Sequence, residues 1–143
     1  MKFIPAKACT LGWLLFCMVN PLSAHDLVIN VTNIKDLQGE LLVSVCTNPE
    51  HYKKRSCHYE KTVAVNDYNI QAYFSNLDEA EYAVLVLQDM NNNSQLDKSF
   101  LGTPREPFGF SNNPSVRFGP PAYKKTAFTL HSDQQIDIKL YNR

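Results

Sequence analysis

Tyr68-Asn69-Ile70-Gln71-Ala72-Tyr73-Phe74-Ser75 is the stretch of sequence that decides the fold class. Tyr68, Ile70, Ala72 and Phe74 alternate with more polar neighbours, and successive side chains of a β-strand point to opposite faces. A period of two therefore predicts a half-buried strand. The same period, or in one case an almost wholly apolar run, recurs along the chain and gives seven expected strands: 26–32, 40–46, 62–65, 68–75, 82–87, 125–130 and 136–140.

Seven short strands without a long amphipathic run predict an all-β fold. We expect an antiparallel two-sheet sandwich of the immunoglobulin or transthyretin type, with its core between the sheets. A small closed β-barrel is the alternative. The apolar run 82–87 is typical of a central strand covered on both faces. Residues 76–80 are the only segment for which we expect a helical turn.

The composition indicates one globular domain. The chain has 143 residues, 44% of them hydrophobic, with 14 basic and 14 acidic side chains. This apolar fraction is too high for a disordered tail. The balanced charge gives no broad basic surface of the kind that nucleic acids or anionic membranes attract, so no nucleic-acid partner is expected.

Residues 1–24 have the pattern of a secretory signal peptide. Lys2 and Lys7 precede the apolar run 8–19, and the segment ends on the small residue Ala24. Twelve apolar residues are too few to span a bilayer, which needs about 20. We therefore expect cleavage before His25, a single mature domain over 25–143 without an integral membrane segment, and export to the periplasm or beyond.

The mature chain keeps two of the four cysteines, Cys46 and Cys57. Two cysteines in an oxidising compartment permit one disulfide, which the chain-entropy estimate values at roughly 3 kcal/mol. A metal site formed by these cysteines with His51 and His58 is the alternative.

Residues 89–123 interrupt the strand pattern and hold five of the eight prolines. Connections this long are uncommon without a function. We expect an ordered excursion over one end of the sandwich, because several of its side chains are too apolar to leave in water: Leu101, Phe108, Phe110, Val116, Phe118 and Tyr123.

The excursion begins with the sequence Asp89-Met90-Asn91-Asn92-Asn93-Ser94-Gln95-Leu96-Asp97. Side-chain oxygens at relative positions 1, 3, 5 and 9 and the carbonyl at position 7 predict a calcium loop, with these ligands: Asp89, Asn91, Asn93, Asp97 and Gln95. Ser94 stands where glycine is usual and Phe100 where a bidentate glutamate is usual, so affinity should be weak, with a Kd of roughly 10⁻⁴–10⁻³ M. The alternative is a turn whose Asx side chains bond their own backbone and hold no ion.

The D-x-N-x-N-x-x-L-D loop and the following block, Gly102-x-Pro104-x-Glu106 with Gly109-Phe110-Ser111-Asn112-Asn113, resemble a family of small exported bacterial proteins catalogued as a domain of unknown function. The resemblance implies an extracytoplasmic β-sandwich and brings no established activity. Leu77 to Tyr82 is also similar to the L-P-x-G-x-Y turn of transthyretin-like sandwiches, with Asp78 and Ala80 in place of proline and glycine.

These features predict a binding or interaction module with a protein, peptide or carbohydrate partner. The expected recognition surface comprises Phe108, Phe110, Asn112 and Tyr123, although such aromatics more often cap a core. One alternative is a small hydrolase that uses the carboxylates of Asp89, Asp97 and Glu106. Another is an accessory domain that docks on a second chain through Phe108 and Phe110. No nucleophile motif is present, so we assign no catalytic residue.

Overall fold

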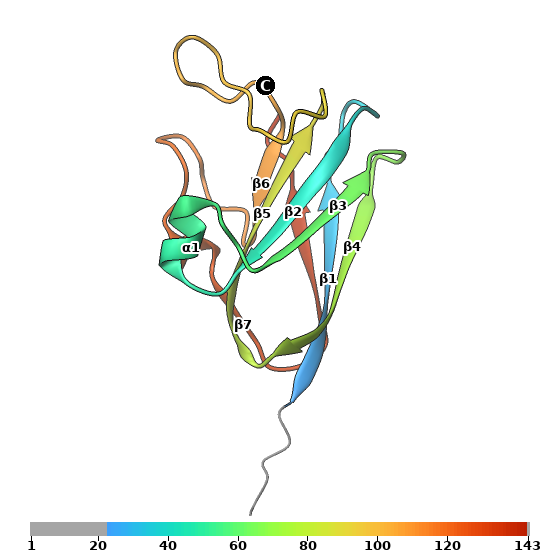
Figure 1. Cartoon of the computed structure of the whole chain (residues 1–143), viewed down its shortest axis with the longest axis vertical. Coiled ribbons are helices and arrows are strands. Elements are labelled where there is room, and N and C mark those ends of the chain that lie inside the picture. The colour runs from blue at the N-terminus through green and yellow to red at the C-terminus, as the bar shows by residue number, and fades with distance from the viewer. Residues whose placement is uncertain (1–22, 143) are drawn as a thin grey trace, which may run out of the picture.

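Two β-sheets pack face to face in the computed structural model, which describes residues 23–142 (Figure 1). The signal peptide predicted for 1–24 falls almost wholly outside the described residues. The first sheet has the order β4-β1-β8 and the second the order β3-β2-β5-β6, with β7 paired to the start of β5. The strands are β1 Ala24–Thr32, β2 Glu40–Cys46, β3 Tyr59–Ala64, β4 Ile70–Asp78, β5 Ala80–Asp89, β6 Phe108–Phe110, β7 Phe128–Leu130 and β8 Gln134–Lys139, and the helices are α1 Pro49–Lys54 and α2 Tyr123–Thr126.

The predicted all-β sandwich is confirmed, and the barrel alternative is wrong because the two sheets do not close on each other. The neighbouring strands are antiparallel with one exception, the parallel pair β1–β8. β1 and β8 are the first and last strands of the described chain and are not connected by a tight hairpin, so they can pair in parallel. No helix among residues 23–142 is long and apolar enough to span a bilayer.

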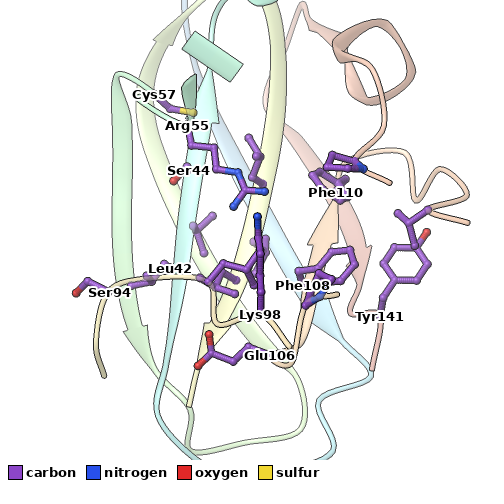
Figure 2. A pocket seen from close by; sticks show the side chains of 18 of the residues that line it. Leu42, Ser44, Arg55, Cys57, Ser94, Lys98, Glu106, Phe108, Phe110 and Tyr141 are labelled. Atoms are coloured by element: carbon purple, nitrogen blue, oxygen red, sulfur yellow. The ribbon is translucent and has the colours of Figure 1, made fainter. Parts of the chain in front are cut away.

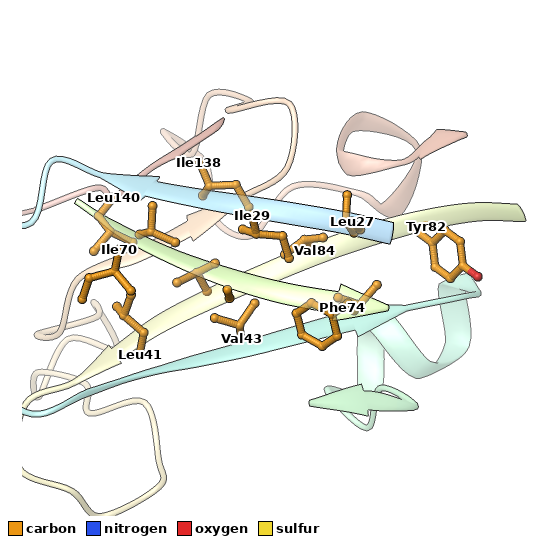
Figure 3. Packing of buried hydrophobic residues seen from close by; sticks show 14 of the residues in the cluster. Leu27, Ile29, Leu41, Val43, Ile70, Phe74, Tyr82, Val84, Ile138 and Leu140 are labelled. Carbon is orange, nitrogen blue, oxygen red and sulfur yellow. The ribbon is translucent and has the colours of Figure 1, made fainter. Parts of the chain in front are cut away.

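The core lies between the sheets and follows the alternation of the sequence (Figure 3). In β1, Leu27, Ile29 and Val31 are fully buried, whereas the residues between them are only partly buried. The other strands contribute their alternate residues in the same way, including Leu41, Val43, Ile70, Phe74, Tyr82, Val84 and Ile138. Each fully buried Leu, Ile or Val contributes about 1.5–3 kcal/mol relative to an exposed one.

The sequence misplaced the helical segments. The expected strand 125–130 begins only at Phe128, because α2 covers Tyr123–Thr126. Residues 76–80 form no helical turn, because Leu77 is buried as part of β4 and the chain bends at Glu79 into β5. Helix α1 was not predicted at all. It begins where the Asn48 side chain accepts a hydrogen bond from the His51 N–H at 2.9 Å, with Pro49 in the first turn. Six residues are too few for an amphipathic pattern.

The excursion 89–123 is more structured than expected. It contains β6, which extends the second sheet beside β5, and the start of α2. Residues 90–106 project at one end of the sheet in Figure 1. Leu101 and Phe118 are 85% and 103% exposed, so the expectation that these two side chains are buried is wrong.

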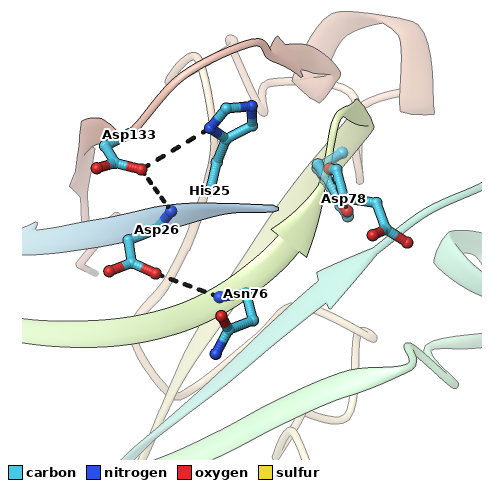
Figure 4. A network of polar contacts seen from close by, with 6 residues as sticks. His25, Asp26, Asn76, Asp78 and Asp133 are labelled. Atoms are coloured by element: carbon cyan, nitrogen blue, oxygen red, sulfur yellow. Dashed lines mark hydrogen bonds and ion pairs between the residues drawn. The ribbon is translucent and has the colours of Figure 1, made fainter. Parts of the chain in front are cut away.

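Polar contacts hold the start of β1 in place (Figure 4). Asp133, just before β8, accepts a hydrogen bond from the Asp26 N–H at 2.9 Å, and its carboxylate lies 3.8 Å from Nδ1 of His25. The Asp26 carboxylate in turn accepts from the N–H of Asn76 on β4 at 3.2 Å. The predicted mature terminus at His25 is therefore built into the sheet.

Cys46 and Cys57 form the predicted disulfide, with their Cα atoms 4.5 Å apart. The alternative metal site is wrong, because the sulfur atoms are bonded to each other and are not available as ligands. The disulfide joins the end of β2 to the segment that follows α1, and so holds this helix against the second sheet.

We predict that Cys46→Ala/Cys57→Ala lowers the free energy of unfolding by roughly 3 kcal/mol, because the reduced chain gains loop entropy on unfolding. Urea unfolding followed by circular dichroism measures this difference, with reduced wild-type protein as the matched control. A loss below about 1 kcal/mol in both samples would contradict the stabilising role.

Candidate functional site

A second apolar cluster lies on the outer face of the second sheet, with these buried members: Cys46, Tyr52, Ala83, Phe110 and Tyr123. It covers the outer side of β5 at Ala83, whereas Leu85 and Leu87 further along the strand are only partly buried, so the prediction of a strand covered on both faces holds for part of its length. The Tyr52 hydroxyl donates to the Pro121 carbonyl at 3.0 Å. Burial raises the pKa of Tyr123 to about 12, with the nearby Glu81 carboxylate adding to the shift.

The Gly109–Asn113 block ties this outer layer to the sandwich. A Cβ atom on Gly109 would lie only 2.7 Å from Cγ2 of Ile138, so the position has no room for a side chain. The buried Ser111 hydroxyl accepts from the Val84 N–H at 2.9 Å and donates to the Thr126 carbonyl. Asn113 accepts from the Lys139 N–H at 2.8 Å. The block therefore joins β5, β8 and the end of α2.

The structure divides the predicted recognition surface. Phe110 and Tyr123 are buried in the second cluster, and the Asn112 amide donates to the Ala127 carbonyl at 2.8 Å. Phe108 is half-buried. Phe108 and Phe110 line the cleft described below, whereas Tyr123 lines a smaller hollow beside Tyr52.

Two buried carboxylates shape the loop between β5 and β6. Asp89 is 1% exposed and accepts from the backbone N–H groups of Asn93 at 3.1 Å and Ser94 at 2.6 Å. Glu106 is 6% exposed and accepts from the N–H groups of Met90 at 2.9 Å and Asp97 at 3.0 Å. Each of these hydrogen bonds to a charged acceptor is worth about 1.5–3 kcal/mol, so together they fold the loop back on itself.

The predicted calcium ligands lie together around Asp97. Its carboxylate accepts from the side-chain amides of Asn91 at 2.6 Å and Asn93 at 3.0 Å, and Asn93 also accepts from the Gln95 N–H at 2.8 Å. Neutral amide N–H groups thus donate to the oxygen atoms that a cation would otherwise contact. Within residues 23–142, no three His, Cys, Asp or Glu side chains gather closely enough to share a metal ion.

A cleft of about 750 Å³ opens over the outer face of the second sheet (Figure 2). Its floor consists of two cross-strand rows. Leu42, Leu87 and Phe108 form one row, and Ser44, Leu85 and Phe110 form the other. The loop segment 94–106 walls one end, and the segments around Cys57 and 116–120 complete the rim. The volume lies within the usual range for small-molecule sites, about 300–1,000 Å³.

The rim of the cleft is cationic. Arg55, Lys98 and Arg117 line it, and none of them forms an ion pair among the described residues. Figure 2 shows the heads of Arg55 and Lys98 directed into the space over the sheet. Two acidic residues also line the cleft, but the Glu106 carboxylate is bound to backbone N–H groups, which leaves Glu60 as the free acid.

Sequence reasoning missed this cleft. The available signal was the outward position of apolar residues: Leu42, Leu85 and Leu87 alternate with core residues yet have no amphipathic helix to cover them. A family model described as an uncharacterised protein conserved in bacteria, DUF2141, matches residues 29–139. The chain belongs to this family. The family match agrees with the bacterial domain of unknown function that the sequence resembles, and no curated protein and no solved structure matches the chain.

We predict that Glu106→Gln lowers the free energy of unfolding by about 2–4 kcal/mol, since Met90 and Asp97 donate to different carboxylate oxygens and one of these becomes an NH2 group that cannot accept. Amide hydrogen exchange should accelerate over residues 90–105. Glu79→Gln is the matched control, because that exposed carboxylate pairs with His131 at the surface and is worth at most about 1 kcal/mol. Equal effects of the two substitutions would contradict the anchoring role.

Calcium binding by the loop stays a prediction, with a direct test. Chelator should leave the Tm unchanged, because N–H donors already close the loop. About 10 mM CaCl2 should then stabilise the fold by about 1.4 kcal/mol for a Kd near 10⁻³ M, a rise of about 5 °C. Asp97→Asn should abolish the rise, and KCl of equal ionic strength is the control. No rise in the wild type would show that the prediction is wrong.

Proposed function

We propose that this chain is an exported binding protein, and that its ligand occupies the cleft on the outer face of the second sheet. The single observation behind the proposal is the cleft itself, whose apolar floor is left open between the 94–106 loop and the 116–120 segment. A sheet face with Leu42, Leu87 and Phe108 in a row costs free energy when it faces water. A ligand that covers these side chains recovers that free energy.

The rigid construction of the walls supports binding in this place. Glu106 fixes one wall through Met90 and Asp97, and the disulfide fixes the segment that carries Arg55. Preorganised walls lower the entropy cost of holding a ligand. The size of the cleft favours a small molecule or a short peptide over a broad protein surface.

The roles of the carboxylates favour binding over hydrolysis. Both carboxylate oxygens of Asp89 and of Glu106 accept hydrogen bonds from backbone N–H groups. The Asp97 carboxylate accepts hydrogen bonds from two side-chain amides. A general acid or base needs an oxygen within reach of the substrate. No contact favours docking of a second chain on Phe110, which is buried.

The test is a substitution that fills the cleft. Ser44 lies in the floor, half-buried between Leu85 and Glu60, so Ser44→Trp should occupy the space above it without disturbing the core. Ser75→Trp is the matched control, because Ser75 is exposed on the other sheet. We predict that the neutral dye Nile red binds the wild type and Ser75→Trp with a fluorescence increase, and binds Ser44→Trp at least about tenfold more weakly, which is a loss of about 1.4 kcal/mol.

Circular dichroism and the Tm should show that both tryptophan variants are folded. Equal dye binding by the two variants, or no binding by the wild type, would contradict a ligand site in the cleft.

A further inference from the structure

We infer that the ligand is a small amphiphile with one anionic head group and an apolar body, the head group lying between Arg55 and Lys98. This inference rests on the proposed function and adds the chemical class of the ligand. The first step is charge. Arg55, Lys98 and Arg117 line the cleft of a protein whose formal net charge is zero, and Glu60 is the one lining acid not bound to backbone N–H groups.

None of these three cations forms an ion pair within residues 23–142. Among the described residues, the ion pairs are His25–Asp133, Lys54–Glu50 and His131–Glu79, and none involves a cation of the cleft rim. Lys61 also borders the cleft, but its ammonium group donates to the Tyr73 carbonyl at 2.6 Å and is therefore engaged elsewhere. Like charges that line one concave surface repel each other and attract an anion, and salt screens this attraction because the three side chains are exposed.

The backbone at Arg55 provides an independent indication. Arg55 ends α1 in the left-handed region, with φ 53° and ψ 40°, where glycine or asparagine is usual. A side chain at this position strains the backbone, and such strain is often found at functional sites. A guanidinium group at this point can bind a carboxylate, sulfonate or phosphate through two parallel hydrogen bonds.

Lys98 reaches the cleft from the opposite wall. It precedes a tight turn in which the Ser99 N–H donates to the Thr103 carbonyl at 2.7 Å. The backbone of Lys98 also forms an isolated antiparallel β-bridge with Pro104. The Glu106 carboxylate anchors the start of this turn through the Asp97 N–H. The two cations thus come from two separately fixed segments, and Figure 2 shows both heads directed into the space over the sheet.

The apolar surface extends beyond the floor. Phe100 and Leu101 stand at the tip of the turn that follows Lys98, and Phe118 follows Arg117; Phe100 and Phe118 are fully exposed and Leu101 is 85% exposed. The two walls therefore carry apolar side chains at their tips and cations on their inner sides. This arrangement matches a ligand whose body is apolar and whose head is anionic.

The experiment compares decanoate with decanol as competitors of Nile red. These two probes share a ten-carbon skeleton and differ in the head group. We expect decanoate to bind at least about tenfold more tightly than decanol, with the difference shrinking as NaCl is raised. Arg55→Gly/Lys98→Gln should bind the two probes equally. Glycine suits the left-handed backbone, so this variant should keep its Tm.

The matched control is Lys35→Gln/Lys139→Gln, which removes the same charge from exposed positions outside the cleft and should keep the preference for decanoate. Equal binding of decanoate and decanol by the wild type, or tighter binding of decyltrimethylammonium, would contradict the inference of an anionic head group. Neither result would contradict the proposal that the cleft binds a ligand. Failure of both probes to displace bound Nile red would overturn the inference and place the dye outside the cleft.

Discussion

The hydrogen bonds of the Glu106 carboxylate are the contacts on which the proposed site depends. A buried carboxylate costs several kcal/mol unless donors surround it, and here the donors are the backbone N–H groups of Met90 and Asp97. This requirement selects one path for the long connection between β5 and β6. Along that path Lys98 lies over the outer face of the second sheet. The Cys46–Cys57 disulfide holds the segment of Arg55 at the opposite rim of the cleft. Without these two constraints the sheet would have an exposed apolar face and no cleft.

Strand β5 connects this outer site to the core. Its inward residues complete the sandwich, and its outward residues, Ala83 and Leu85, belong to the second cluster. The Gly109–Asn113 block joins the two layers through Ser111 and Asn113. This block therefore has a structural role: it places β6 and Phe108 beside β5 and so forms one side of the cleft floor.

The fold was predictable because alternation is a local signal. Leu27, Ile29 and Val31 face the core as their spacing indicates, and the predicted pairing of Cys46 with Cys57 is present. Features set by distant contacts were not predictable. The parallel pairing of β1 with β8 and the three-residue strand β6 depend on neighbours far along the chain. The cleft was missed for the same reason: Arg55 and Lys98 are 43 positions apart in the numbering of the chain and meet only through the fold. The sequence indicated a loop from Asp89 onward, where β5 ends, but the hydrogen bonds of this loop to Glu106 required the structure.

A titration of ¹⁵N-labelled protein with decanoate, followed by amide chemical shifts, tests the central claim most directly. The account predicts saturable shifts over the floor and the two anchored rims, at the amides of these residues: Leu42, Ser44, Leu85, Leu87, Phe108, Arg55 and Lys98. The outer face of β4, around Tyr73 and Ser75, should stay unchanged. Shifts that cluster on β4, or on the fully exposed tips alone without the floor, would contradict a binding cleft on the second sheet.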